Sequence, residues 1–295
     1  MTPSASLLLL LLLGLSQAFP VEEEGSSEEE EEEGEGEEED TIDMTTRILS
    51  TNNGSNENLL EGDLLAPITR NAMRCFSQSC LWKKASGVVT VPYVISYHFS
   101  QSQKNMITRA MEAMERRTCI RFKERSREYD FISIENRQGC FSALGRTGGR
   151  QVLSLSKQGC LHHGIVIHEL NHALGFQHEQ TRSDRDSYVR INWQYIKPST
   201  AYNFHKQNTN NLNTPYDYSS IMHYGRTAFS MNGRETITPI PNGNVQLGQT
   251  LNLLYRYPPF YMPPSVQTKS MPTDTWRKQD KHSESAVLCQ GCSVV

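Results

Sequence analysis

The chain has 295 residues, of which 37% are hydrophobic and 21% are charged, with a formal net charge of −4. This length allows one folded domain with its own core, together with additional segments. The longest apolar run, residues 7–13, is far shorter than the roughly 20 residues of a membrane-spanning helix. We therefore expect no membrane anchor.

Residues 1–18 fit a secretory signal peptide, because the apolar run is followed by small residues up to Ala18. This predicts a secreted, extracellular protein, with secretory granules as one route of export. Residues 22–40 then hold 14 acidic side chains separated only by Gly and Ser, a composition that favours a solvated, disordered segment.

Charge reverses along the chain. After residue 70 it retains 27 of the 29 Lys and Arg but only 15 of the 33 Asp and Glu, a net charge of about +12. Two interpretations of the acidic tract stay open: a solubility tail, or a polyanion that masks the basic remainder until it is cut away.

Residues 71–257 have ordinary globular composition and form one predicted folded domain. Residues 88–97 are rich in β-branched and aromatic side chains, which predicts a strand. Residues 102–117 predict an amphipathic helix, because apolar residues recur at helical spacing. Further strands are predicted at residues 119–123, 131–135 and 151–155, and a second helix at residues 161–174. The pattern indicates an α+β fold with a twisted sheet, whereas residues 258–295 predict a disordered tail.

Residues 168–178 read His-Glu-Leu-Asn-His-Ala-Leu-Gly-Phe-Gln-His. On a helix, residues four apart share one face, so His168 and His172 can present their imidazoles to one ion. Gly175 permits a sharp turn with positive φ that brings His178 back to that ion. Three imidazoles leave one position open for water, which is the geometry of a catalytic zinc. The pattern therefore predicts Zn2+ as the cofactor.

Glu169 follows the first of these histidines. Its carboxylate can take a proton from the water at zinc and give it to the leaving amine, so we predict that Glu169 is the general base of peptide-bond hydrolysis. The remaining histidines outside this motif match no ligand spacing and are expected to be ordinary packed or exposed residues. They include His98, His162, His163, His205 and His282.

The long motif is shared by the metzincins, and its continuation through residues 178–186, His-Glu-Gln-Thr-Arg-Ser-Asp-Arg-Asp, resembles the astacin family. Residues 220–224, Ser-Ile-Met-His-Tyr, resemble the Met-turn of that family. The resemblance implies that Met222 forms a hydrophobic floor beneath the metal. It also implies that Tyr224 is an additional zinc ligand that can swing away and stabilise an oxyanion, roles that a phenol oxygen suits.

The resemblance also implies the architecture and the use of a precursor. The expected fold is two-lobed, with the sheet and the active-site helix in the N-terminal lobe and a largely irregular C-terminal lobe. Residues 19–70 resemble an acidic propeptide, in which Leu60-Glu61-Gly62-Asp63 is similar to the element whose aspartate occupies the water position at zinc. Asp63 would then be the inhibitory ligand.

The residues around position 70 resemble the activation site of the family. A cut after Arg70 by an activating protease would leave Asn71 as the mature amino terminus. In the family this terminus is buried near the glutamate that follows the third histidine, here Glu179. A buried ammonium needs such a partner, which explains why activation requires a cut at one bond.

Cysteine usage agrees with export, because disulfides persist in oxidising compartments, and the odd number leaves at least one cysteine unpaired or intermolecular. By the resemblance, Cys75 and Cys80 form the extra pair of six-cysteine astacins, which include fish hatching enzymes, and Cys140 and Cys160 form a family disulfide. After Gln249 the sequence departs from the family, which continues to a cysteine that pairs with Cys119. Cys289 and Cys292 are the remaining candidate partners.

Together these features predict a secreted zinc endopeptidase made as a zymogen. Its substrates are proteins, with egg-envelope glycoproteins favoured by the subfamily resemblance alone. We expect a monomer without a nucleic-acid partner. Two alternatives stay open: a catalytically silent isoform whose altered C-terminal end prevents a competent fold, and an extracellular binding protein that uses its basic face.

Overall fold

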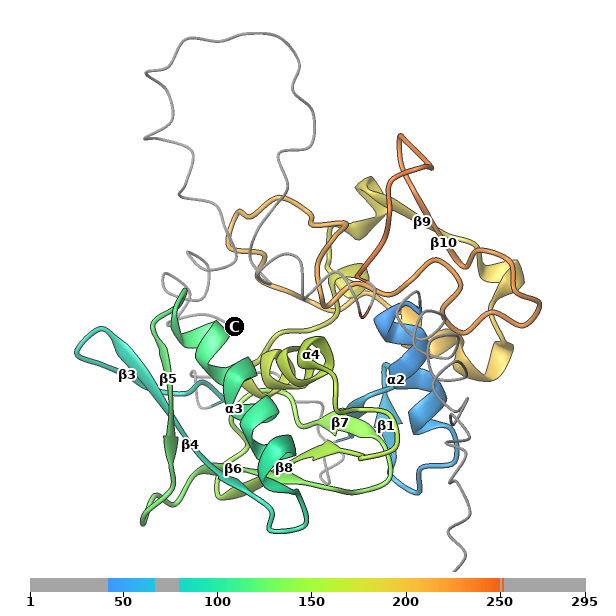
Figure 1. The fold of residues 1–295 in the computed structure, drawn as a ribbon. Coiled ribbons are helices and arrows are strands. Elements are labelled where there is room, and N and C mark those ends of the chain that lie inside the picture. The colour runs from blue at the N-terminus through green and yellow to red at the C-terminus, as the bar shows by residue number, and fades with distance from the viewer. Residues whose placement is uncertain (1–41, 67–79, 250, 252–295) are drawn as a thin grey trace, which may run out of the picture. The chain divides into compact units, whose positions relative to one another are not determined.

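The computed structural model describes residues 42–66, 80–249 and 251 (Figure 1). The α-helices are α2 (Met44–Asn52), α3 (Gln101–Glu115) and α4 (His163–Leu174). The strands are β1 (Leu59–Leu60), β2 (Leu64–Leu65), β3 (Lys84–Ala85), β4 (Val88–Ile95), β5 (Ile120–Glu124), β6 (Phe131–Glu135), β7 (Cys140–Ser142), β8 (Arg150–Leu155), β9 (Val189–Ile191) and β10 (Ile237–Pro239). Short 3-10 helices span Glu179–Thr181, Arg185–Ser187, Trp193–Tyr195 and Pro198–Phe204.

An eight-stranded sheet has the order β1-β2-β7-β8-β6-β4-β3, with β5 paired to β4. Its middle is parallel, because β4 pairs in parallel with β5 and β6, and β6 in parallel with β8. Strand β7 then runs antiparallel to β8. Parallel strands are usually covered on both faces, and the first four residues of β6 are all buried.

Helices α3 and α4 pack side by side, with α3 against β5 and α4 against β7 and β8 (Figure 1). Helix α3 begins at a capping box in which Ser100 and Gln103 satisfy each other's backbone N–H groups. Every residue of α4 after His163 is buried. The helix that carries the histidine motif therefore lies inside the core.

After α4 the chain is largely irregular. One two-stranded ribbon pairs β9 with β10, and a second apolar cluster gathers around Phe204, Tyr224 and Ile237. The first cluster lies between the sheet, α3 and α4. This arrangement confirms the predicted α+β fold with a sheet-containing first lobe and an irregular second lobe.

The segment before residue 67 packs on the first lobe and also contacts the second lobe through Glu61. Helix α2 starts at Asp43, whose carboxylate accepts from the Thr45 and Thr46 N–H groups, and it contacts α4 and β7. Strands β1 and β2 form an antiparallel hairpin, and β2 pairs in parallel with β7. This segment thereby extends the sheet at its β7 edge.

The predicted strands at residues 88–97, 119–123, 131–135 and 151–155 and both predicted helices are present, with ends shifted by up to two residues. The helix predicted at residues 102–117 extends too far at its C-terminal end, because α3 ends at Glu115 and Arg117 is exposed. The domain boundaries predicted at residues 18, 70 and 257 lie outside the described residues and stay predictions.

Candidate metal centre

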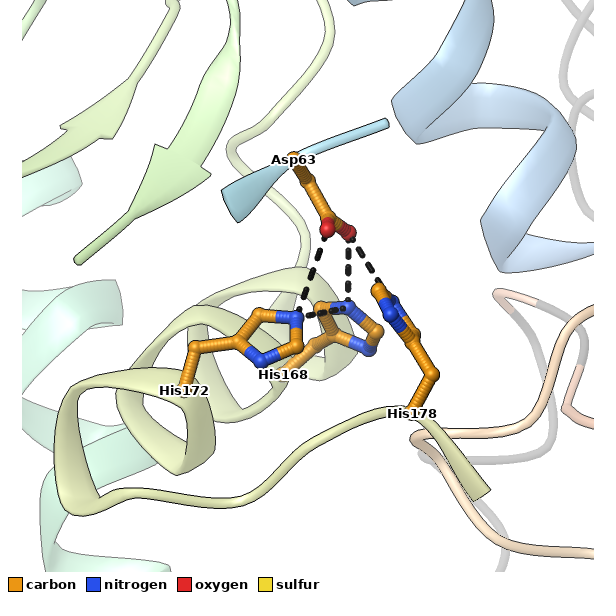
Figure 2. A group of neighbouring side chains, drawn as sticks. All are labelled: Asp63, His168, His172 and His178. Atoms are coloured by element: carbon orange, nitrogen blue, oxygen red, sulfur yellow. Dashed lines mark hydrogen bonds and ion pairs between the residues drawn. The ribbon is translucent and has the colours of Figure 1, made fainter. Parts of the chain in front are cut away.

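Helix α4 presents two of the predicted ligands. His168 and His172 lie one turn apart and are both buried. The helix stops at Gly175, which has φ 111° and ψ 8°, a left-handed conformation that suits a residue without Cβ. The chain then turns and returns His178 to the same place (Figure 2).

Asp63 completes the cluster from above the three rings (Figure 2). Its Oδ2 lies 3.0 Å from Nε2 of His168 and 3.3 Å from Nε2 of His178, and its Oδ1 lies 3.4 Å from Nε2 of His172. The Nε2 atoms of His168 and His172 are 3.1 Å apart. All four side chains are buried, and they come from two segments more than 100 residues apart.

The donor set fits a zinc ion. Two atoms that each lie about 2.0–2.1 Å from a tetrahedral zinc are about 3.3–3.4 Å apart, close to the 3.0 to 3.4 Å that separate Asp63 from each histidine and His168 from His172. In each ring Nδ1 donates to an oxygen outside the cluster, so the Nε2 lone pairs converge on one point. Converging lone pairs and a carboxylate repel one another unless a cation lies between them. These residues could hold zinc as four ligands.

The charges of the buried cluster residues also influence one another. Burial opposes a charge on Asp63, but His178 and His172 hold the pKa of its carboxyl well below the usual range. Burial also opposes a charge on His178, yet Asp63 and Glu61 raise its pKa to about 9. For His172 burial prevails over Asp63 and lowers the pKa to about 4. The site thus keeps a charged carboxylate in contact with imidazoles.

Glu169 lies beside this cluster and is completely buried. Within the described part of the chain, neither of its carboxylate oxygens has a hydrogen-bond partner. Burial, and secondly the charge of Asp63, raise the pKa of Glu169 well above its usual range. A buried carboxyl without partners is costly, and such groups mark functional sites.

The predicted Met-turn residues also lie at the site. Met222 is buried, and its Sδ lies 3.6 Å from Nδ2 of Asn171 on α4. The ring of Tyr224 lies 4.7 Å from that of His178, centroid to centroid, and its hydroxyl donates to the backbone carbonyl of Glu61. In this structure the segment before residue 67 therefore holds the Tyr224 hydroxyl.

The side chain of Glu179, the expected partner of the mature amino terminus, is largely buried. Its Oε1 accepts from Nη1 of Arg182 at 3.0 Å and from the N–H of Asp217 at 2.9 Å. Burial is the largest cause that raises the pKa of Glu179 to about 7, although Arg182 opposes the rise. Asn71, its expected partner, lies outside the described residues.

The disulfide between Cys140 and Cys160 is present, and it joins β7 to the segment just before α4. Cys80 is also in a disulfide, while Cys75 lies outside the described residues. Cys119 is buried. The fate of Cys289 and Cys292 stays untested, since both lie outside the described residues.

The sequence-based prediction assigns no role to one residue of the site, Glu61. Glu61 is buried, and its carboxylate accepts from Nδ1 of His178. The motif Leu60-Glu61-Gly62-Asp63 was noted for its aspartate alone. A second carboxylate two positions before Asp63 is the sequence feature that could have indicated a role for Glu61 at the site.

Comparison with known proteins agrees with this geometry. Residues 77–254 match the model of the Astacin peptidase family. The chain is 61% identical over 251 residues to high choriolytic enzyme 1 of Oryzias latipes, covering 84% of this chain and 92% of the relative. It is 52% identical over 211 residues to the low choriolytic enzyme of the same fish, covering 70% of this chain and 78% of the relative.

The solved structure of high choriolytic enzyme 1, a hatching enzyme zinc-protease, is also similar. It superposes with a TM-score of 0.58 at 65% identity, covering 61% of this chain and 90% of that one. Within the described residues, no helix has the length and apolar character of a membrane span. On its motif, its metal-competent cluster and these matches, the chain belongs to the astacin family of zinc metalloendopeptidases.

Proposed function

We propose that this chain is the secreted precursor of a hatching-type endopeptidase that cleaves egg-envelope proteins. In this proposal residues 1–18 are the signal peptide, residues 19–70 the propeptide and residues 71–257 the catalytic part. His168, His172 and His178 hold the zinc. Asp63 is the inhibitory ligand that keeps the precursor inactive.

The observation that carries the proposal is the contact of Asp63 with all three histidines. A carboxylate from the segment before residue 70 takes the place where a reacting group would have to lie. The same segment pairs with β7 at Leu64 and Ser142, so it also covers a strand edge with which an extended peptide could pair. Both features block access to substrate and disappear when the segment leaves.

A zinc ion on three imidazoles supplies a Lewis acid for the scissile carbonyl and lowers the pKa of water to about 7. Glu169 acts as the general base that takes a proton from the attacking water and gives it to the leaving amine. Removal of Asp63 relieves one of the two causes that raise the pKa of Glu169, which favours the charged form that a base needs.

Tyr224 becomes available in the same step. Its hydroxyl donates to the Glu61 carbonyl in the precursor, so departure of the segment frees it to donate to the oxygen of the scissile carbonyl. The Asn71 ammonium would then reach Glu179. In the precursor the carboxylate of Glu179 accepts a hydrogen bond from Arg182. Met222 supports α4 through its contact with Asn171.

The substrate class rests on the relatives. Two of them are choriolytic enzymes by name, and the matched length covers 92% of high choriolytic enzyme 1. An exported endopeptidase of this kind needs an activating protease that cuts after Arg70. The egg envelope is the protein substrate that the similarity favours.

The test uses the purified precursor and trypsin as the activating protease. Activated wild type should cleave casein and isolated egg envelope, and a zinc chelator should abolish both activities. Glu169→Gln should lower kcat by at least about 100-fold without loss of zinc, because only the base is removed. Asp63→Asn should give measurable casein cleavage before trypsin treatment.

Each outcome separates the competing interpretations. Folded, zinc-loaded and trypsin-cut protein that cleaves neither substrate would support the silent isoform. Casein cleavage without egg-envelope cleavage would refute the hatching role alone. Salt-dependent envelope binding that survives in Glu169→Gln, without hydrolysis by wild type, would support a binding protein.

A further inference from the structure

Each cluster histidine has a second ring nitrogen, Nδ1, that faces away from the cluster. For His168 the partner is the carbonyl oxygen of Ile221, and for His172 it is that of Phe176, each at 2.8 Å. A carbonyl oxygen only accepts, so both rings carry their proton on Nδ1 and turn the Nε2 lone pair to the cluster. Both partners belong to the backbone of the catalytic part.

His178 differs, because its Nδ1 partner is Oε2 of Glu61 at 2.8 Å. Among the described residues, Glu61 is therefore the hydrogen-bond partner of Nδ1 of His178. Glu61 lies before residue 70, in the segment that activation would remove. Two of the three outward partners therefore stay after processing, while the third leaves.

Glu61 is held firmly in place. It is 4% exposed, and its Oε1 accepts from Nε2 of Gln207 at 2.9 Å. Its backbone N–H donates to Oδ1 of Asn203 at 2.9 Å, and its carbonyl accepts from the Tyr224 hydroxyl. Side chain and backbone are thus both fixed by residues of the second lobe.

The backbone of Glu61 also has a φ of +51°, a left-handed conformation that is uncommon for residues other than glycine. Such a conformation persists only where the surroundings determine it strongly, and it is typical of functional sites. In this conformation the Glu61 carboxylate contacts Nδ1 of His178. Asp63, two residues later, contacts Nε2 of the same histidine.

We propose that Glu61 is an outer-sphere positioning residue for His178, so that the propeptide tightens zinc binding as well as blocking the site. The inference rests on the proposed zinc site. A carboxylate that accepts from Nδ1 fixes the ring orientation and makes Nε2 a better ligand, and loss of such a partner typically weakens metal binding roughly 10- to 100-fold. Zinc is therefore held more tightly in the precursor than in the processed enzyme.

Zinc affinity of the whole precursor, measured by competition with a chromophoric chelator, tests this directly. Glu61→Ala should weaken zinc binding roughly 10- to 100-fold, and Glu61→Gln should weaken it less, because its amide oxygen can still accept from Nδ1. The control is Glu57→Gln, a carboxylate of the same segment that pairs with Arg137, outside the cluster, and should leave zinc affinity unchanged.

Two further measurements separate positioning from a general structural effect. In the cobalt-substituted precursor, the visible d–d spectrum should shift in Glu61→Ala and return toward wild type in Glu61→Gln. After trypsin processing, with the cleaved propeptide separated at high dilution, wild type and Glu61→Ala yield the same chain, so their zinc affinities should coincide at the weaker value. If Glu61→Ala does not fold, Glu61→Gln and Glu61→Asp provide the same comparison.

Folded Glu61→Ala precursor with wild-type zinc affinity and an unchanged cobalt spectrum would overturn the inference and leave the zinc site intact. Equal weakening in Glu57→Gln would also overturn it, because the effect would then be general to the segment. Failure of wild-type precursor to bind zinc stoichiometrically would instead refute the proposed function. The two failures are therefore distinguishable.

Discussion

At the scale of single residues, Gly175 links the helical and the non-helical parts of the metal centre. Its N–H donates to the His172 carbonyl at 2.9 Å while its φ of 111° turns the chain away from the helix axis. Three residues later His178 meets the two helical ligands. A side chain at position 175 would be strained in this conformation, whatever the space around it.

Gly175→Ala should therefore lower stability and weaken zinc binding together. Left-handed strain costs about 1–3 kcal/mol, and relief of that strain would move His178 away from the other two rings. Thermal unfolding and chelator competition on the precursor measure the two effects. Gly87→Ala is the matched control, since Gly87 has φ +82° with nothing near its added Cβ and lies on the β3–β4 turn. An equal loss of zinc affinity in both variants would contradict a local role.

At the scale of elements, a charged network joins β6, β8 and the segment before residue 67. Glu135 on β6 accepts from Nε of Arg137 at 3.0 Å, from the Ser133 hydroxyl at 2.6 Å and from Arg150 on β8. Arg137 also pairs with Glu57 at 3.1 Å. Burial of Glu135 would raise its pKa, but these donors lower it.

A lowered carboxyl pKa makes the stability contribution of Glu135 depend on pH. The contribution is complete above the unfolded-state pKa of about 4.3 and is lost as pH falls through the lower folded-state value. Glu135→Gln should thus reduce Tm by about 2–4 °C near pH 7, equivalent to about 1 kcal/mol, and this difference should shrink as pH falls below about 4. Calorimetry across this range gives the measurement. Glu124→Gln, an exposed site on β5, should show no such pH-dependent gap, and a gap for Glu135→Gln that persists at low pH would count against this network.

The metal centre was predictable because its spacing is local. A helix places His168 and His172 on one face, and a glycine at position 175 permits the return of His178. Strands β4, β6 and β8 were equally predictable from their runs of apolar side chains. Strand β7 was not predicted, because three residues show no period, and it is a strand through pairing with β8.

The contacts of the segment before residue 67 were harder to predict. Helix α2 has few apolar residues and becomes a helix where Met44 and Ile48 can pack on the first lobe. The partnership of Glu61 with His178 spans 117 positions. Nothing in the sequence shows that two histidines find backbone partners for Nδ1 while the third finds a carboxylate.

At the scale of the whole molecule, residues 42–66, which belong to the proposed propeptide, contact the rest of the described chain at several places. Asn52 accepts from the Cys140 N–H at 2.6 Å and donates to the carbonyls of Cys140 and Gly62 at 2.7 and 2.8 Å. These bonds connect the end of α2, strand β7 and the turn that precedes Asp63. Further contacts bury the apolar side chains of Met44, Ile48 and Leu64.

One cut after Arg70 should therefore leave the propeptide bound, since none of these contacts depends on the peptide bond at that site. Full burial of an apolar side chain contributes about 1.5–3 kcal/mol, and three such side chains with the Asn52 bonds can offset much of the cost of association.

Limited trypsin digestion, confirmed by mass and then quenched, should give a nicked complex whose propeptide co-elutes with the catalytic part in size-exclusion chromatography at micromolar concentration. Protease activity should rise after dilution, with a lag set by dissociation. Asn52→Ala should release the propeptide at higher protein concentration and shorten the lag, whereas Asn56→Ala, an exposed neighbour, should not. Separation of the wild-type fragment at micromolar concentration without a lag would show that the covalent link, and not the docked surface, keeps Asp63 on the histidines.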